Sequence, residues 1–384
     1  MTKVKVVAIA KDESAYLPEW IFHHLYFGFD SIDIYVNNTS DRSLELSDML
    51  SDFRNVNFLD GDEIFSNFTH PQRVVYSLAL LQAKEDGFTH VIFLDIDEFW
   101  TPLDFTTDIK HCLNTIDADI ISFEWFNKFD HEEFSPAIEL EMLGEHHSLV
   151  KSILSLKHDY EKIDIHNSEC SDAVYKLADG TEGVYVNNNQ HVVLDDKPLK
   201  PYFITHRMFR SQLEYVSLLG RGRPTSTSSF KDNRNGYNQV NKEIKTVLIS
   251  ETGFCEYVNK RTEFFEKYIT DSYLNDSIDF VKSRYQQVVD KIESASLHEL
   301  STLRKILKGV ERSDVNQAFS NYLSGVANKF NNKFIDSIRD AAIALEKDSI
   351  DKSMQLMEVA LMLRPNGPLL KRKVTQYKKI LEKN

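Results

Sequence analysis

The sequence predicts an α/β protein whose parallel, doubly wound sheet is followed by a helical C-terminal region. Apolar, strand-like runs alternate with helical periodicity over the first 125 residues, and helical periodicity alone continues after about residue 263. The strand-like runs are too apolar to have a solvated face, which is typical of parallel sheets covered by helices on both sides.

The alternation can be followed along the chain. Strands are expected at residues 4–10, 31–37 and 55–60, with a fourth ending at Asp95. Helices are expected at residues 14–29, 43–53 and 71–85. Between about residues 125 and 260 the pattern breaks into short strands and polar loops, and loops of that length are usually functional.

Length and periodicity together predict two domains. At 384 residues the chain exceeds the usual size of one domain. We predict an α/β domain over residues 1–262 and a helical accessory region over 263–384. Within that region, residues 331–384 resemble one tetratricopeptide-type helical hairpin plus a further helix, in which Ala341, Ala344 and Ala360 face bulky residues.

The composition excludes some classes of partner. The 45 Lys and Arg residues against 59 Asp and Glu give a net charge of −14, which argues against nucleic acid binding. Three widely spaced cysteines fit neither a disulfide framework nor a zinc cluster, and no apolar run approaches a membrane span. We therefore expect a cytoplasmic protein.

The helical region has two features that could bind a partner. The basic tail "KRKVTQYKKILEKN" (371–384) could make peripheral contact with the anionic inner face of the cell membrane, although a solvated final helix is the simpler explanation. The helical region as a whole could recruit a protein partner.

The stretch "THVIFLDIDEFW" (89–100) predicts a binding site. Asp95 and Asp97 follow a buried strand, and ligands of doubly wound sheets bind beyond the carboxyl ends of the strands. Two carboxylates at this spacing suit Mn²⁺ or Mg²⁺, which prefers carboxylate oxygens combined with substrate phosphates. The alternative is a solvated acidic turn.

Several segments together resemble the family 2-like glycosyltransferases, and in particular a D-x-D-E-F subgroup related to the family 92-type enzymes. The segments are "AIAKDESAYLPEWIFHHLYFGFDSIDIYVNNTSD" (8–41), "FLDIDEFW" (93–100), "VKSIL" (150–154), His166 and "ITHRMFRSQLEYVSLLGRGRP" (204–224). The resemblance covers roughly residues 4–225. It implies a GT-A fold, a nucleotide-sugar donor and a divalent metal ion.

The resemblance also implies roles for individual residues. Base and ribose would be held by Asp12, Glu13, Asn38 and Asp41. Metal and diphosphate would be held by Asp95 and Asp97, with His206 as a further metal ligand. The donor site would also include Lys151, His166, Arg207, Arg210, Arg221 and Arg223. Lys11 and Asp12 replace the subgroup's usual Arg-Asn, and Asn38 stands where many relatives carry Asp. The alternative for His206 and the arginines is that they pack in the core or lie on the surface without contacting a ligand.

An inverting glycosyltransferase needs a carboxylate that takes the proton of the acceptor hydroxyl. The candidates are Asp130, Glu124, Glu132 and Glu133, around the end of the strand expected at 119–125. The sequence does not choose among them, and each could instead be a solvated loop charge.

These observations predict a metal-dependent glycosyltransferase that moves a hexose from a nucleotide diphosphate sugar, with uridine as the favoured base. The acceptor would be a glycan or a lipid-linked molecule, and the resemblance alone implies bacterial surface polysaccharide synthesis as the setting. One alternative is a nucleotidyltransferase, although "AKDESAY" (10–16) stands where such enzymes carry a Gly-rich, basic phosphate loop. The other is a non-catalytic scaffold.

Overall fold

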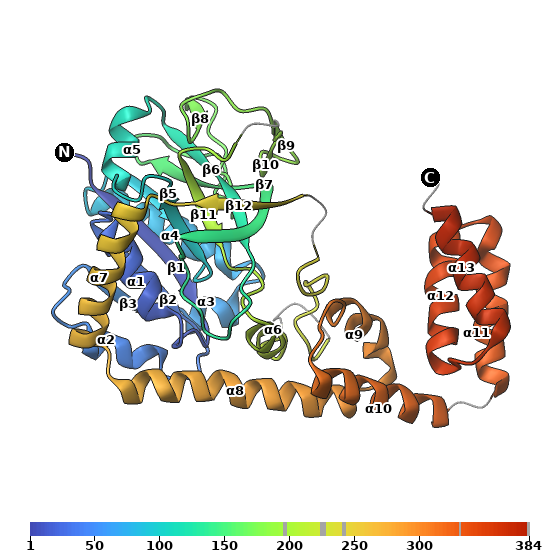
Figure 1. The fold of residues 1–384 in the computed structure, drawn as a ribbon. Coiled ribbons are helices and arrows are strands. Elements are labelled where there is room, and N and C mark those ends of the chain that lie inside the picture. Colours follow the sequence, from blue (N-terminus) through green and yellow to red (C-terminus); the bar gives the residue numbers. More distant parts are fainter. Residues whose placement is uncertain (195–197, 223–227, 240–242, 330–331, 382–384) are drawn as a thin grey trace. The chain divides into compact units, whose positions relative to one another are not determined.

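The chain forms two compact units in a computed structural model, shown in Figure 1. The first unit contains Met1–Leu218 and Asn238–Arg284, and the second contains Leu219–Tyr237 and Tyr285–Asn384. The structure describes residues 1–194, 198–222, 228–239, 243–329 and 332–381.

The first unit is built on one large sheet. In chain order its strands are β1 (Val4–Ala10), β2 (Ser31–Val36), β3 (Val56–Asp60), β4 (His90–Phe93), β5 (Glu98–Pro102), β6 (Ile120–Lys128), β7 (Glu141–Ser155), β8 (Tyr175–Leu177), β9 (Tyr185–Val186), β10 (His191–Val192), β11 (Tyr202–His206) and β12 (Ile244–Leu248). The main path across the sheet runs in the order β3-β2-β1-β4-β7-β6-β11-β5.

The predicted parallel sheet is present in its first four strands and becomes mixed beyond β4. Strands β3, β2, β1 and β4 are parallel neighbours. Strand β7 then runs antiparallel to both β4 and β6, while β11 is parallel to β6 and antiparallel to β5. Residues 129–140 join β6 to β7 without a helix, and a parallel pair would need a long crossover there. The α/β class is confirmed, and the parallel arrangement expected from the first 125 residues extends over β1 to β4 before the sheet becomes mixed.

Helices cover this sheet. In chain order they are α1 (Leu17–Tyr26), the 3₁₀ turn η1 (Ser43–Glu45), α2 (Leu46–Met49), α3 (Asp62–Asn67), α4 (Pro71–Glu85), α5 (Ile109–Thr115), α6 (Gln212–Leu219) and α7 (Glu251–Tyr268). On α4, Tyr76 is fully buried and stacks on Phe93 of β4 with ring centroids 4.1 Å apart. Burial of such rings explains why the apolar stripe of α4 lies on the sheet.

Only helices follow. They are α8 (Asp271–Glu293), η2 (Leu297–Glu299), α9 (Leu300–Ile306), α10 (Ser313–Lys329), α11 (Asn332–Ala344), η3 (Leu345–Lys347), α12 (Ile350–Leu363) and α13 (Pro368–Leu381). The last three α-helices lie side by side in Figure 1, with α12 packed against both α11 and α13. The predicted helical C-terminal region is confirmed, while its tetratricopeptide-like character stays a prediction.

The division of the chain follows packing. The boundary between the units falls within α8, between Arg284 and Tyr285. The predicted division at residue 262 lies inside α7, whose Tyr257 packs on Phe22 of α1 with centroids 5.1 Å apart. Among the described residues, no helix is both long and apolar enough to cross a bilayer.

Two adjacent histidines lie in the core between α1, α7 and β5. The ring of His23 bonds through Nδ1 to the Tyr257 hydroxyl at 3.1 Å and through Nε2 to the Trp100 carbonyl at 2.8 Å. His24 Nδ1 lies 2.8 Å from the Trp20 carbonyl. Burial lowers the pKa of His23 to about 3 and that of His24 well below its ordinary value. Both rings are therefore neutral in the folded protein near pH 7.

The folded protein should be sensitive to mild acid because of these rings. In the unfolded chain His23 takes up a proton near pH 6.5, whereas in the fold it does so only near pH 3. Stability is therefore lost as the pH falls below 6.5, by about 1.4 kcal/mol at pH 5.5 for His23 alone. Urea unfolding at pH 7.5 and 5.5 should show a smaller loss in His23→Gln than in wild type. Equal losses in both proteins would show that His23 does not contribute.

Candidate functional site

The turn Asp95–Glu98, which joins β4 to β5, is held from two sides. The indole Nε1 of Trp20 donates to the carbonyls of Asp95 at 3.1 Å and Glu98 at 2.9 Å. The Glu98 carboxylate is fully buried, and its Oε2 accepts the backbone N–H of Asp95 at 2.8 Å. The turn therefore has a fixed shape that depends on side chains of α1 and β5.

Lys151 of β7 supplies the charge that balances this turn. Its Nζ lies 3.0 Å from Glu98 Oε2 and 3.3 Å from Asp95 Oδ2. Burial raises the pKa of Glu98 well above its usual value, and Lys151 opposes that rise. Burial would lower the pKa of Lys151, but Asp95 and Glu98 together raise it above its ordinary value. Lys151 therefore stays charged, and it fixes the orientation of Asp95, whose side chain is 41% exposed.

His206 lies at the end of β11 and faces Asp97. The imidazole Nε2 lies 3.7 Å from Asp97 Oδ2, too far for a good hydrogen bond. On the other side of the ring, Nδ1 lies 3.0 Å from the amide oxygen of Asn127. An amide oxygen only accepts, so Nδ1 carries a proton, and in the neutral ring Nε2 then holds the lone pair on the side of Asp97. The backbone N–H of Arg207 donates to the Asp97 carbonyl at 2.8 Å, which ties the two segments together.

This pair can supply two ligands to a cation. Among the described residues, no group of three His, Cys, Asp or Glu side chains is placed to hold a metal ion. Mg²⁺ and Mn²⁺ commonly take one or two protein ligands and complete their shell with water and substrate phosphate. Asp97 and His206 therefore fit an ion that is bound together with a phosphorylated ligand, and they do not form a closed structural metal site.

The residues expected to hold the nucleotide organise the loop after β2. Asp12 follows β1, and its Oδ1 accepts the backbone N–H of Ser40 at 2.8 Å. Asp41 Oδ2 accepts the backbone N–H of Ser14 at 2.7 Å. Asp12 and Asn38 have φ angles of +52° and +43°, a region that few residues other than glycine adopt. Asn38 is exposed, whereas Asp12 is buried. The structure brings these residues together, with Asn38 as the one presented to solvent.

Buried arginines are each matched by a carboxylate. Arg207 Nε lies 2.8 Å from Asp130 Oδ2, and Lys128 Nζ lies 2.7 Å from Oδ1 of the same residue. Arg210 Nη2 lies 3.1 Å from Glu13 Oε2, and its guanidinium stacks 3.4 Å from the ring centroid of Tyr16. Burial acts to raise the pKa of Asp130, but the attraction of Arg207 and Lys128 outweighs burial and lowers this pKa below its ordinary value. A carboxylate with a lowered pKa is a weak proton acceptor, so Asp130 suits a role in orienting Arg207.

The other base candidates are spread over the first unit. Glu124 lies on β6 and pairs with His146 of β7, with Oε2 and Nε2 2.8 Å apart. Side chains alternate between the two faces of a strand, so Glu124 lies on the face opposite to Trp125 and Asn127. Trp125 and Asn127 are the residues that contact His206. Glu132 and Glu133 are exposed in the loop before β7.

The roles of two further arginines stay predictions. Arg221 belongs to the second unit, which is described by itself, and Arg223 lies outside the described residues. His166, by contrast, lies beside Trp125 with ring centroids 5.3 Å apart, and its Nδ1 is 3.2 Å from the Val150 carbonyl. Burial lowers the pKa of His166 to about 3, so its ring is neutral.

Two residues that shape the site, Glu98 and Asn127, are not singled out by the sequence pattern. Glu98 stands inside the D-x-D-E-F motif, and Asn127 follows the strand expected at 119–125. The ring of Trp125 lies 4.0 Å from that of His206, and its buried Nε1 has no hydrogen-bond partner among the described residues. The usable signal was the position of Trp125 and Asn127, two residues apart at the end of a buried strand.

The balance between Lys151 and Glu98 can be tested by a double-mutant cycle. Lys151→Met leaves Glu98 buried without its partner charge and should lower the free energy of unfolding by about 3–5 kcal/mol. Glu98→Gln keeps the side chain's shape and removes the charge, so the double variant should be more stable than the sum of the single losses predicts. Urea unfolding of the four proteins measures this coupling, and strictly additive losses would contradict it.

Comparison with known proteins yields only distant likenesses. No family model matches the chain, and no curated protein matches it. Among solved structures, S. aureus TarS residues 1–349 in complex with UDP is 14% identical, covers 86% of this chain and 93% of its own, and has a TM-score of 0.29. HddC from Yersinia pseudotuberculosis is 12% identical over 54% of this chain and 93% of its own, with a TM-score of 0.28. A cytidylyltransferase from Leptospira borgpetersenii is 10% identical over 41% and 62%, with a TM-score of 0.21. TM-scores this low do not indicate a shared fold.

Proposed function

We propose that the protein is a metal-dependent glycosyltransferase that moves a hexose from a nucleotide diphosphate sugar to a glycan or lipid-linked acceptor. The observation that carries the proposal is the facing pair Asp97 and His206, 3.7 Å apart, which lie in the turn between β4 and β5 and at the end of β11. Asp12 follows β1, and Asn38 and Asp41 follow its neighbour β2 in the same sheet. A divalent ion and a nucleotide would thus be bound beyond the carboxyl ends of these strands, where doubly wound sheets bind their ligands.

Charge balance supports the need for a cation. Each of four cations around the site already has a carboxylate partner: Lys151 with Glu98, Arg207 with Asp130, Arg210 with Glu13 and Arg284 with Asp12. A donor diphosphate brings further negative charge that these paired groups cannot fully neutralise. An ion between Asp97, His206 and the diphosphate would stabilise the charge that develops on the leaving group.

The chain's own residues would then have separate tasks. Lys151 and Glu98 hold Asp95 and the turn, Trp20 clamps the turn's carbonyls, and Asn127 sets the tautomer of His206. Asn38, which is exposed in the loop after β2, would contact the nucleotide. The proton of the acceptor hydroxyl needs a carboxylate, and Glu132 and Glu133 remain candidates because both are exposed in the loop before β7.

The reaction class is tested by the products. Purified protein with Mn²⁺ or Mg²⁺ is incubated with a panel of nucleotide diphosphate sugars, and the release of nucleoside diphosphate is measured. A glycosyltransferase should release nucleoside diphosphate slowly by hydrolysis without an acceptor. Formation of pyrophosphate from a nucleoside triphosphate and a sugar phosphate would instead identify a nucleotidyltransferase.

Asp97→Asn should reduce nucleoside diphosphate release at least about 100-fold, since a charged ligand of the ion is lost. The exposed Asp172→Asn carries the same charge change away from the turn and should behave as wild type. Both variants should keep the wild-type melting temperature within a few degrees. Full activity of Asp97→Asn, or of wild type in excess chelator, would end the metal hypothesis.

His206→Ala should raise the metal concentration needed for half-maximal activity, because Nε2 is lost as a ligand. Asn127→Ala should have a weaker effect in the same direction, because it frees the ring that Asn127 orients. Titration with Mn²⁺ at a fixed nucleotide-sugar concentration measures both. If His206→Ala needs no more metal than wild type, His206 is a packing residue.

A further inference from the structure

One face of α13 is positively charged and carries no acid. The apolar residues Leu370, Val374 and Tyr377 of this helix are buried within the second unit. Five of its fourteen residues are Lys or Arg, and none is Asp or Glu. Over residues 332–381 ten Lys and Arg stand against six Asp and Glu, while the whole chain has a net charge of −14. Positive charge is thus concentrated on one element of an acidic protein.

Only part of this charge is neutralised nearby. Lys373 Nζ lies 2.6 Å from Glu346, and Lys378 Nζ lies 3.9 Å from Glu358. Lys371, Arg372 and Lys379 are exposed and make no ion pair within the part of the chain that the structure describes. Those three side chains therefore leave a net positive surface.

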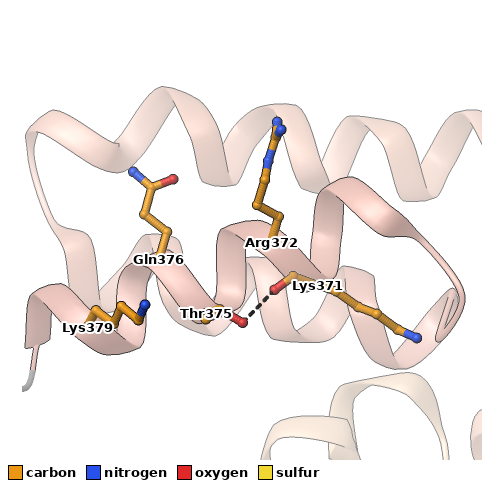
Figure 2. Close-up of a pocket in the computed structure, with 5 residues that line it drawn as sticks. All are labelled: Lys371, Arg372, Thr375, Gln376 and Lys379. Atoms are coloured by element: carbon orange, nitrogen blue, oxygen red, sulfur yellow. Dashed lines mark hydrogen bonds between the residues drawn. The ribbon is translucent and has the colours of Figure 1, made fainter.

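The three cations line a hollow of about 460 Å³, together with Thr375 and Gln376, as Figure 2 shows. Residues 371, 375 and 379 follow one another at successive turns, and residues 372 and 376 form the adjacent row. In Figure 2, Arg372 and Gln376 extend to the same side of α13, and Lys371 and Lys379 lie at opposite ends of the drawn segment. Eight residues of helix separate these two lysines by about 12 Å along the axis.

We propose that this hollow binds a linear polyanion, a chain that carries repeated phosphate or carboxylate groups. Arg372 can pair with an anionic oxygen in a forked geometry, and the two lysines can contact anionic groups on either side of it. The Thr375 hydroxyl donates to the Lys371 carbonyl at 3.0 Å, so the Gln376 amide is the group that can donate a hydrogen bond to an oxygen between the charged groups. We identify this chain with the acceptor, an identification that rests on the proposed function.

A chain-like ligand fits this surface better than a bilayer. A helix that lies in a membrane interface turns an apolar face to the lipid, but the apolar face of α13 is buried inside the second unit. Of its large apolar side chains, Ile380 and Leu381 at the C-terminal end are each only 37% exposed. Three lysines and arginines alone give weak attraction to an anionic membrane. An open, cationic surface that also carries the Gln376 amide instead suits an extended anionic chain that lies along the helix.

The negative net charge of the whole protein explains why a cationic site would be needed to bind an anionic chain. A molecule of net charge −14 repels an anionic chain at low ionic strength, which slows their encounter. A local cluster of unneutralised cations can overcome this repulsion over a Debye length of about 8–10 Å. The site on α13 would thus hold an anionic acceptor on a protein that otherwise repels it.

Binding of fluorescein-labelled inorganic polyphosphate to the full chain, measured by anisotropy at several salt concentrations, tests the proposal. The variant K371Q/R372Q/K379Q should bind at least about tenfold more weakly and with a shallower salt dependence, because three phosphate contacts are lost. The control K333Q/K347Q/K352Q removes the same charge from exposed positions on α11, η3 and α12, and it should bind within about twofold of wild type. Circular dichroism checks that both variants keep their helices.

Three results would overturn the proposal. The first is equal loss of binding in the two triple variants, which would show that only net charge matters. The second is absence of polyphosphate binding by wild type. The third is binding of wild type to vesicles of phosphatidylglycerol without binding to polyphosphate, which would assign the surface to a membrane. Hydrolysis of nucleotide sugar by the same wild-type preparation reports on the proposed function separately, so polyphosphate binding without hydrolysis would refute only the identification with the acceptor.

Discussion

The candidate site depends on a buried ion pair. Lys151 and Glu98 are both removed from solvent, 3.0 Å apart, between β7 and the turn that follows β4. Burial of two charges carries a large desolvation cost, which is offset only when geometry and hydrogen bonds are favourable. Here Glu98 also accepts the backbone N–H of Asp95, and Lys151 also contacts the Asp95 carboxylate. The pair is therefore better explained by the fixed position of the acidic turn than by stability alone.

The same network explains why the sheet must become mixed at this point. Lys151 can reach the turn only because β7 lies directly beside β4, in a register that pairs Val91 with Leu154. Since β7 runs antiparallel to β4, its residues before Leu154 lie toward the end of β4 where the turn begins. Strand β6, next to β7, brings Asn127 to His206. The antiparallel insertion of β7 thus delivers Lys151 to the edge at which β6 and β11, which run in the same direction as β4, present Asn127 and His206.

The sequence predicted the local elements better than the long-range pairs. Alternating apolar runs located β1 to β4 and the helices between them, because burial on both faces leaves a clear pattern in the residues themselves. The insertion of β7 leaves no such local pattern, since strand partners are set by tertiary packing. Likewise Asp95 and Asp97 could be found from their position after a strand, whereas the contact between Asn127 and His206 joins residues 79 positions apart. The sequence also pointed to Arg207 and Asp130 as site residues, but only the fold shows that the two form an ion pair with each other.

Two regions of the chain use positive charge in opposite ways. In the first unit, Lys151, Arg207 and Arg210 are buried and paired, so they orient carboxylates and contribute little free positive charge. On α13, Lys371, Arg372 and Lys379 are exposed, and no ion pair with them is found among the described residues. A buried pair is rigid and is little screened by salt, whereas an exposed cluster is adaptable and strongly screened. The first arrangement suits a site that must hold one small ligand in a defined geometry. The second suits a surface that must hold a flexible chain in many registers, because its contacts can be exchanged one at a time as the chain moves.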